Sequence, residues 1–284
     1  MAKSIMIQGT ASGVGKTILT LALCRIFKQD AYTVAPFKAQ NMTANTRLTG
    51  SGDEIAISQW LQALAAGVEP CVDMNPVILK PGAQKGTQVI LYGRPYDMID
   101  ARNYKEVKAK LAAEIMEAYS RLCSKYDVLV IEGAGSPVEL NLNKNDIVNM
   151  GMAKKANAPV LLVSDIDRGG VFASMYGTLA LMDEAERNHV KAVVVNRFKG
   201  NPAQFTDGVK ILEDITQKPV AGVLPHIKIE LPEEDDMFEA VDIIEGSTDF
   251  ERQIDDIAYN IRRNLDMSLI YNILDKGFNL CQGA

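Results

Sequence analysis

The segment from Gln8 to Thr17 contains the residue types that hold the phosphates of a nucleotide. It reads Gln-Gly-Thr-Ala-Ser-Gly-Val-Gly-Lys-Thr and lies between a short apolar run and a helical pattern that starts at Ile18. A strand that ends in a glycine-rich turn before a helix directs backbone N–H groups and the positive helix end at one point. Lys16 would neutralise the β and γ oxygens, and the Thr17 hydroxyl would bind Mg²⁺.

The segment therefore predicts ATP with Mg²⁺ as its ligand. Its spacing differs from the standard phosphate-binding loop, because Gly9 lies one residue too far from Gly15 and Lys16. A plain glycine-rich turn is the alternative. We expect nucleotide contacts from Thr10, Gly13, Val14, Gly15, Lys16, Thr17 and Ile18.

Two acidic positions are candidates for the metal. Glu132 directly follows the apolar run 128–131 and precedes Gly133, Ala134 and Gly135. A carboxylate at the end of a neighbouring strand can bind Mg²⁺, and small residues beside it let a ligand approach the backbone. A carboxylate that caps the next turn is the alternative. The acidic pair 53–54 precedes a helical pattern, where capping explains it equally well.

Three further side chains follow predicted strands. Lys38 is suited to bridge a phosphate and an anionic substrate, although a solvated loop would also explain it. Arg168 precedes two glycines, and two nitrogens of its guanidinium group could bind a carboxylate. A structural ion pair with an aspartate is the alternative. Asn196 could donate and accept the two hydrogen bonds of an adenine edge, or be a turn residue.

The pattern around these residues predicts an α/β fold in which they share one edge of a sheet. Apolar, β-rich runs alternate with helical patterns, which is typical of a parallel sheet covered by helices on both sides. Functional side chains then lie just past the strand ends. We expect strands at 4–7, 33–36, 89–92, 128–131, 160–163, 192–195 and 220–223. We expect helices at 55–66, 104–123, 147–156 and 171–182.

The chain changes character after Pro225. Residues 230–251 contain many acidic residues and no basic one, and helical spacing of apolar residues resumes at Phe250. We therefore predict a main domain at 1–227, an acidic linker at 228–249 and a helical tail at 250–284.

Composition narrows the class of protein. The chain has 284 residues, 47% of them hydrophobic, and a net charge of −6 without a basic stripe, which makes nucleic acid a poor partner. No apolar run reaches the length of a membrane span, and no signal peptide is evident, so we expect no membrane partner and a cytoplasmic location. The four cysteines and two histidines lack zinc-site spacing and are interpreted as reduced bystanders.

The combined motifs resemble a known family. The Gly-Thr-x4-Gly-Lys-Thr loop and the Glu-Gly-Ala-Gly strand end resemble the dethiobiotin synthetase group of P-loop ligases. Within that group, seven ordered segments look like the synthetase half of the cobyric acid synthase family. They start at Gln8, Ala35, Met74, Ile131, Asp146, Asp165 and Val195.

This resemblance implies a P-loop three-layer fold and ATP-dependent amidation in cobalamin biosynthesis. The substrate would be a corrinoid a,c-diamide whose b, d, e and g carboxylates are amidated through an acyl phosphate. In that scheme Lys38 spans the γ-phosphate and the substrate carboxylate, and Arg168 steers the polyanionic ring. Glu54, rather than Asp53, joins Thr17 and Glu132 at Mg²⁺. Asn196, Arg197 and Pro225 are expected at the base.

One part of the family pattern is not found. No cysteine of the printed sequence lies in a Gly-x-Cys-x-Gly turn and neither histidine precedes x-Glu, as the family's glutaminase domain would require. We expect ammonia to come from a separate glutaminase subunit or to be used free. Residues 250–267 look like the helix that closes full-length members, and a homodimer is left open.

Two other functions are alternatives. A partitioning or regulatory P-loop ATPase would have a second lysine early in the loop, where this chain has Thr10 and Ala11. A dethiobiotin synthetase-like ligase acting on another small substrate fits the segments at Asp146 and Asp165 less well.

Overall fold

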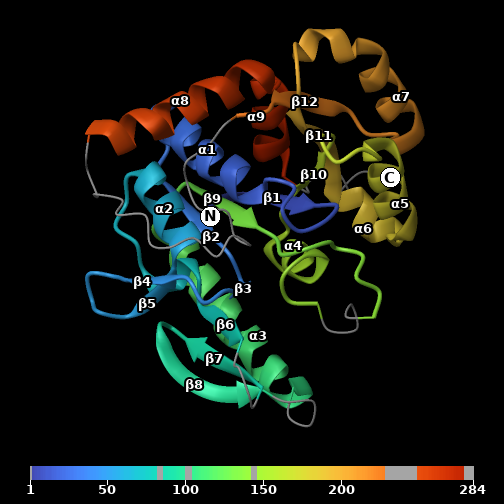
Figure 1. Cartoon of the computed structure of the whole chain (residues 1–284). Helices are drawn as coiled ribbons and strands as arrows, with labels where there is room; N and C mark the ends of the chain where they lie inside the picture. Colours follow the sequence, from blue (N-terminus) through green and yellow to red (C-terminus); the bar gives the residue numbers. More distant parts are fainter. Residues whose placement is uncertain (1, 82–85, 100–103, 142–145, 228–247, 278–284) are drawn as a thin grey trace.

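The computed structural model describes residues 2–81, 86–99, 104–141, 146–227 and 248–277. Its centre is a six-stranded sheet in the order β12-β11-β10-β1-β9-β2, in which every neighbouring pair is parallel. Helices lie on both sides of the sheet (Figure 1). This architecture confirms the predicted fold class.

The strands of this sheet are mostly buried on both faces, as their continuous apolar runs predict. Their bounds are β1 Lys3–Gly9, β2 Val34–Phe37, β9 Val128–Glu132, β10 Val160–Asp165, β11 Val190–Phe198 and β12 Val220–Pro225. The carboxyl ends of β1, β9, β2 and β11 carry the phosphate loop, Glu132, Lys38 and Asn196 respectively. The parallel order places these groups on one edge of the sheet.

The helices cover the sheet, and α1 is the most deeply buried of those described. α1 (Lys16–Gln29) is buried over most of its length between the sheet, α2 (Ile57–Ala66) and the C-terminal helix α8 (Thr248–Asn264). The others are α3 Tyr104–Cys123, α4 Met150–Ala156, α5 Val171–Leu181, α6 Glu184–His189, α7 Thr206–Thr216 and α9 Met267–Lys276, with short 3₁₀ turns at Val72–Met74 and Pro202–Phe205.

Residues 89–92 were predicted as a strand of the parallel sheet, and the sheet assignment is wrong. Residues 89–91 belong to β7 (Thr87–Leu91), and Tyr92 follows it. β7 is antiparallel to both β6 (Val77–Pro81) and β8 (Arg94–Ile99) in a second sheet, β3-β6-β7-β8, with β3 at Gln40–Met42. A short apolar run has the same composition in either sheet, so it does not indicate its neighbours.

The helix predicted from 55 begins later, at Ile57. Residues Glu54–Ala56 form β5 instead, which pairs with β4 (Thr46–Leu48) in a two-stranded ribbon. Glu54 is therefore held by a strand rather than by a helix N-terminus.

The tail is helical, as predicted, and packs on the main domain. α8 lies over α1, and α9 contacts β1 and β12 (Figure 1). The apolar positions of α8 that resume helical spacing, Phe250, Ile254, Ile257 and Ile261, are all buried. Most of the predicted acidic linker lies outside the described residues, and the domain boundaries stay a prediction.

Within the described ranges, no helix is both long and apolar enough to span a membrane. Cys24, Cys71 and Cys123 are free thiols, while Cys281 lies outside the described residues.

Candidate active site

The phosphate loop connects β1 directly to α1. Gly15 forms the N-cap of α1 with φ of 94°, a left-handed conformation that favours glycine. A Cβ at Gly15 would lie 2.1 Å from Nδ2 of Asn196, so the loop also needs glycine for this close approach. The first residues of α1 are Lys16 and Thr17, both buried. The loop N–H groups and the positive end of α1 thus face the same edge of the sheet.

A buried carboxylate lies beside this loop. Glu132 ends β9 at 1% exposure, and its Oε1 accepts hydrogen bonds from the Thr17 hydroxyl at 2.9 Å and from Lys38 Nζ at 3.0 Å. Its Oε2 accepts one from Gln62 Nε2 at 2.6 Å. Burial by itself raises the pKa of this carboxyl, but the Lys38 charge and the Gln62 hydrogen bond outweigh burial and lower the pKa below its ordinary value. Glu132 is therefore held as an anion.

Lys16 extends across the mouth of the loop. Its Nζ donates to the Ala11 carbonyl at 3.1 Å and to the Gly135 carbonyl at 3.4 Å. It therefore joins the loop after β1 to the loop after β9, in the space that a triphosphate would enter.

Thr17 and Glu132 supply the kind of oxygen ligands that Mg²⁺ prefers. Among the described residues, no three His, Cys, Asp or Glu side chains group closely enough to bind a metal by themselves. A magnesium ion would therefore depend on Thr17, Glu132 and phosphate oxygens. Glu54 is not among the contacts of that pair: it forms an ion pair with Lys80 and accepts a hydrogen bond from Thr46 at 2.9 Å. Its role at the metal stays a prediction.

The sequence patterns did not predict two residues of this site, Gln62 and Asn149. Gln62 lies one turn after Gln59 on α2, and both amides point at Glu132. Buried amides at i and i+3 on an otherwise apolar helix were the available signal. Asn149 bonds to the backbone of the loop after Glu132, to Ala134 N at 3.0 Å and to Ala134 O at 2.6 Å. It thereby fixes the loop whose carbonyl accepts from Lys16.

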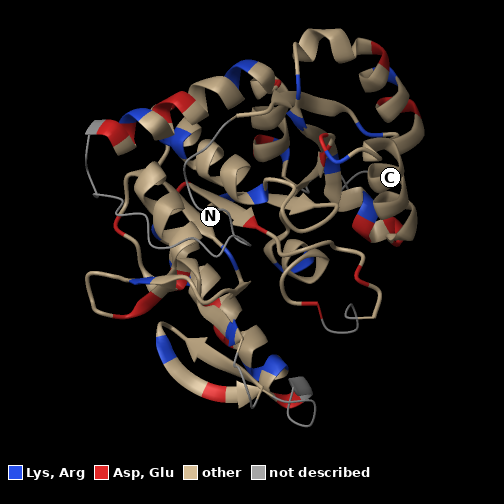
Figure 2. Ribbon diagram, viewed as in Figure 1, with Lys and Arg blue, Asp and Glu red and all other residues tan. Residues whose placement is uncertain are grey.

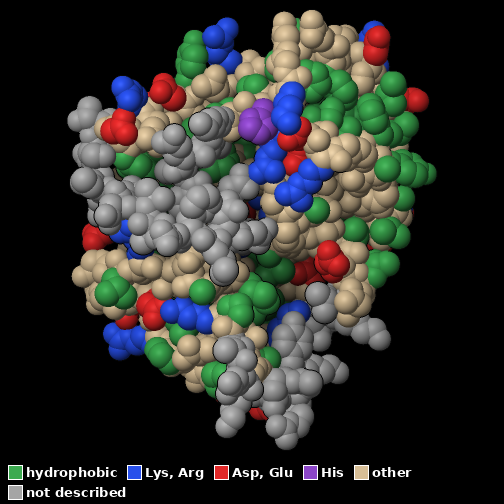
Figure 3. All heavy atoms as spheres, in the orientation of Figure 1, with side chains coloured by type: hydrophobic (Ala, Val, Ile, Leu, Met, Phe, Trp, Pro, Cys, Tyr) green, Lys and Arg blue, Asp and Glu red, His purple; other side chains and the backbone are tan. Residues whose placement is uncertain are grey.

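The segment around Asp165 contributes a charged surface near the strand ends. The Asp165 carboxylate pairs with Arg197 at 3.0 Å and more loosely with Arg168 at 3.5 Å, and Lys199 pairs with Asp167 at 2.6 Å. The Arg168 side chain is 67% exposed, so it faces solvent rather than the loop. Figure 3 shows basic side chains gathered with a few acidic ones beside a histidine on this face.

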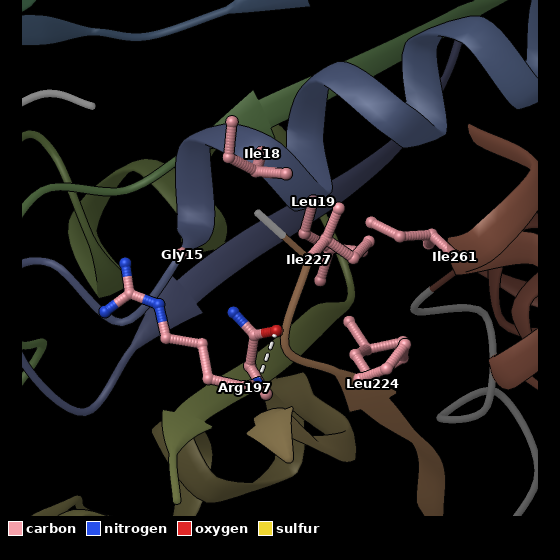
Figure 4. A pocket seen from close by; sticks show the side chains of 9 residues that line it. Gly15, Ile18, Leu19, Arg197, Leu224, Ile227 and Ile261 are labelled. Atoms are coloured by element: carbon pink, nitrogen blue, oxygen red, sulfur yellow. Dashed lines mark hydrogen bonds between the residues drawn. The ribbon is translucent and has the colours of Figure 1, made fainter. Parts of the chain in front are cut away.

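A pocket lies beside Gly15, at the start of α1. Its polar members are Asn196 and Arg197, and Pro225 lies at its rim. Ile18, Leu19, Leu224, Ile227 and Ile261 converge on it (Figure 4).

Asn196 is anchored at both ends of its amide. Its Nδ2 donates to the Val14 carbonyl at 2.8 Å, and its Oδ1 accepts from the Arg197 N–H at 2.8 Å. A carboxamide has a second hydrogen and a second acceptor lone pair, so it can still bind an adenine edge.

We expect Asn196→Ala to raise the KM for ATP and to narrow the preference for ATP over GTP. Each lost base hydrogen bond is worth about 1–3 kcal/mol, whereas the lost bond to Val14 would affect both nucleotides alike. Saturated turnover should change little, because the base is remote from the reacting phosphate. Steady-state kinetics with ATP and GTP measure the ratio. An unchanged ratio would leave Asn196 as a residue that only anchors the loop.

A glycine turn between a parallel strand and a buried helix, next to a strand-end carboxylate, defines a P-loop nucleotide-binding protein. The chain belongs to the CobQ/CobB/MinD/ParA nucleotide binding domain family, whose model matches residues 5–237.

Within this family, the chain is similar to proteins that are cobyric acid synthases. The chain is 53% identical over 235 residues to a cobyric acid synthase of Caldanaerobacter subterraneus, covering 83% of this chain and 46% of the relative. It is 47% identical over 270 residues to the cobyric acid synthase of Streptococcus sanguinis, covering 95% of this chain and 52% of the relative. The chain thus spans about half the length of the curated relatives that it matches.

Among solved structures, the signal recognition particle receptor FtsY of Elizabethkingia anophelis is similar at a TM-score of 0.48 and 19% identity, covering 91% of this chain and 66% of that one.

Proposed function

We propose that the chain catalyses ATP-dependent amidation of peripheral carboxylates of a corrinoid a,c-diamide, a step of cobalamin biosynthesis. The observation that supports it most is the buried Glu132 anion, which contacts both Thr17 of the phosphate loop and Lys38. The similarity to cobyric acid synthases at about half identity supports the substrate class.

The proposed reaction has two steps. A carboxylate oxygen of the substrate attacks the γ-phosphorus of ATP, and ADP leaves with the electrons of the broken P–O bond. Ammonia then attacks the carbonyl carbon of the acyl phosphate, inorganic phosphate leaves, and a proton is lost from nitrogen to give the amide. Catalysis in such a scheme comes mainly from positioning and from neutralising charge.

The residues of the chain would divide this work. Lys16 and the loop N–H groups hold the β- and γ-phosphates, and Lys38, fixed by Glu132, spans the γ-phosphate and the attacking carboxylate. Thr17 and Glu132, with Glu54 as a further candidate, would hold Mg²⁺, which neutralises phosphate charge when bound. Arg168, exposed at the edge of the site, would attract the polyanionic corrinoid.

The nitrogen donor can be tested directly. The chain alone should amidate the corrinoid diamide with ATP and ammonium chloride at alkaline pH. It should not do so with glutamine, because no cysteine of the printed sequence lies in the Gly-x-Cys-x-Gly turn of a glutaminase. Product is measured by mass spectrometry, since each amidation lowers the mass by about one unit.

The control adds a purified glutaminase together with glutamine, which should restore product by releasing ammonia. Glutamine-driven product from this chain alone would contradict the nitrogen source, and no product with any donor would contradict the proposed activity.

A further inference from the structure

The pocket beside Gly15 is built from α1, β11, β12 and α8, which are far apart in sequence. Ile18 and Leu19 come from α1, Leu224 comes from β12, and Ile261 comes from the tail helix α8. Figure 4 shows the Ile261 side chain extending from α8 toward Ile227 and Leu19. Helix α8 of the tail therefore forms part of the pocket wall.

α8 is fixed to α1 by charge pairs. Arg25 of α1 donates to Asp255 at 2.7 Å and to Glu251 at 2.7 Å, and its side chain is only 8% exposed. Just past the end of α1, Asp30 accepts from Arg262 at 2.9 Å. Figure 2 shows acidic and basic residues alternating along α8. These pairs hold the helix in the register that directs Ile261 to the pocket.

The end of α8 is also fixed to the strand that carries the other wall. The Asp266 N–H donates to the Ala221 carbonyl at 2.7 Å. A Cβ at Gly222 would lie 2.3 Å from the Asn264 carbonyl, so the strand and the helix end touch through their backbones. Because β12 and α8 are joined in this way, the positions of Leu224 and Ile261 depend on each other.

We propose that Ile261 is a base-contacting residue and that docking of α8 and binding of the purine are coupled. Apolar side chains such as Leu19, Leu224 and Ile261 suit contact with a purine base, whereas the phosphates would be bound by the loop before α1. A ligand that contacts two elements favours the state in which both are docked, and docking raises its affinity by the same factor. This inference rests on the proposed nucleotide-binding function and extends it to the tail.

The test compares a ligand that has a base with one that lacks it. In the full chain, Ile261→Ala should weaken binding of ATP by roughly 10-fold, because apolar contact with the base is lost, and should leave binding of tripolyphosphate unchanged. Isothermal titration with both ligands measures this. Ile261→Val, which removes one methylene, should show a smaller loss in the same direction and retains the fold if the alanine variant does not.

Two controls come from the same helix. Ile254→Ala truncates an equally buried isoleucine that is not part of the pocket lining, and Tyr259→Ala changes an exposed residue. Both should keep a larger share of ATP affinity than Ile261→Ala. Equal losses from Ile254→Ala and Ile261→Ala would overturn the base contact.

The coupling has a reciprocal readout. ATP should slow amide hydrogen exchange in residues 250–264, and tripolyphosphate should not. Exchange in α8 that is unaffected by ATP would overturn the coupling. Failure of the unmodified chain to bind ATP at all would instead reject nucleotide binding itself, so the two failures can be told apart.

Discussion

Lys38→Met is expected to lower the free energy of unfolding by about 3–5 kcal/mol at neutral pH, because it leaves Glu132 without its buried cation. The Lys38 and Glu132 side chains are 1% and 0% exposed, so water cannot replace the lost partner. The double variant Lys38→Met/Glu132→Gln removes both charges of this pair, and it should regain most of this stability. Urea unfolding of both variants and of the unmodified chain measures the difference.

The pH dependence of that loss has a defined sign. In the unmodified chain the pKa of Glu132 is lowered, so its stabilising contribution is present above the unfolded-state pKa and is lost as pH falls through the folded-state pKa. In Lys38→Met, burial would instead raise that pKa, so the penalty should shrink as pH falls and Glu132 takes up a proton. A penalty that is constant between neutral and acidic pH would contradict the ion-pair account.

Lys16→Ala is expected to reduce ATP-dependent turnover by on the order of 10²–10³-fold, the usual cost of removing one preorganised donor from the transition state. Nζ of Lys16 already lies between the two loops, at 3.1 Å from the Ala11 carbonyl and 3.4 Å from that of Gly135. Release of inorganic phosphate in the presence of the corrinoid diamide and ammonia measures the effect.

Lys28→Ala is the matched control for this loss. Lys28 lies in the last turn of the same helix and is exposed, so its removal changes the charge of α1 without touching the loop. It should keep near-normal turnover. A Lys16→Ala variant within threefold of the unmodified rate would remove Lys16 from the phosphate site.

The polar residues that follow the strands were the part of the site that the sequence predicted best. Glu132 and Lys38 each directly follow an apolar run, and parallel strands end at a common edge, so their proximity follows from order and composition. The same reasoning failed for the run at 89–92, because its apolar content does not indicate which strand it pairs with.

Contacts between distant segments could not be predicted. Gln62 and Asn149 bind to the Glu132 carboxylate and to its following loop only because α2 and α4 are brought to β9 by tertiary packing. The apolar spacing of residues 250–265 predicted a helix, but nothing in that spacing indicated that Ile261 would line a pocket with Leu19.

The docking of α8 on α1 also sets an order of events during synthesis of the protein. The Arg25–Asp255 hydrogen bond joins residues 230 positions apart. At the usual pace of translation, that interval corresponds to roughly 10–45 s after Arg25 is made. During this time the face of α1 that α8 will cover has no tail to pack against, although the phosphate loop and its helix have already left the ribosome. The phosphate loop and α1 can therefore form early, whereas the α8 side of the pocket beside Gly15 is added only after residue 264 has been made.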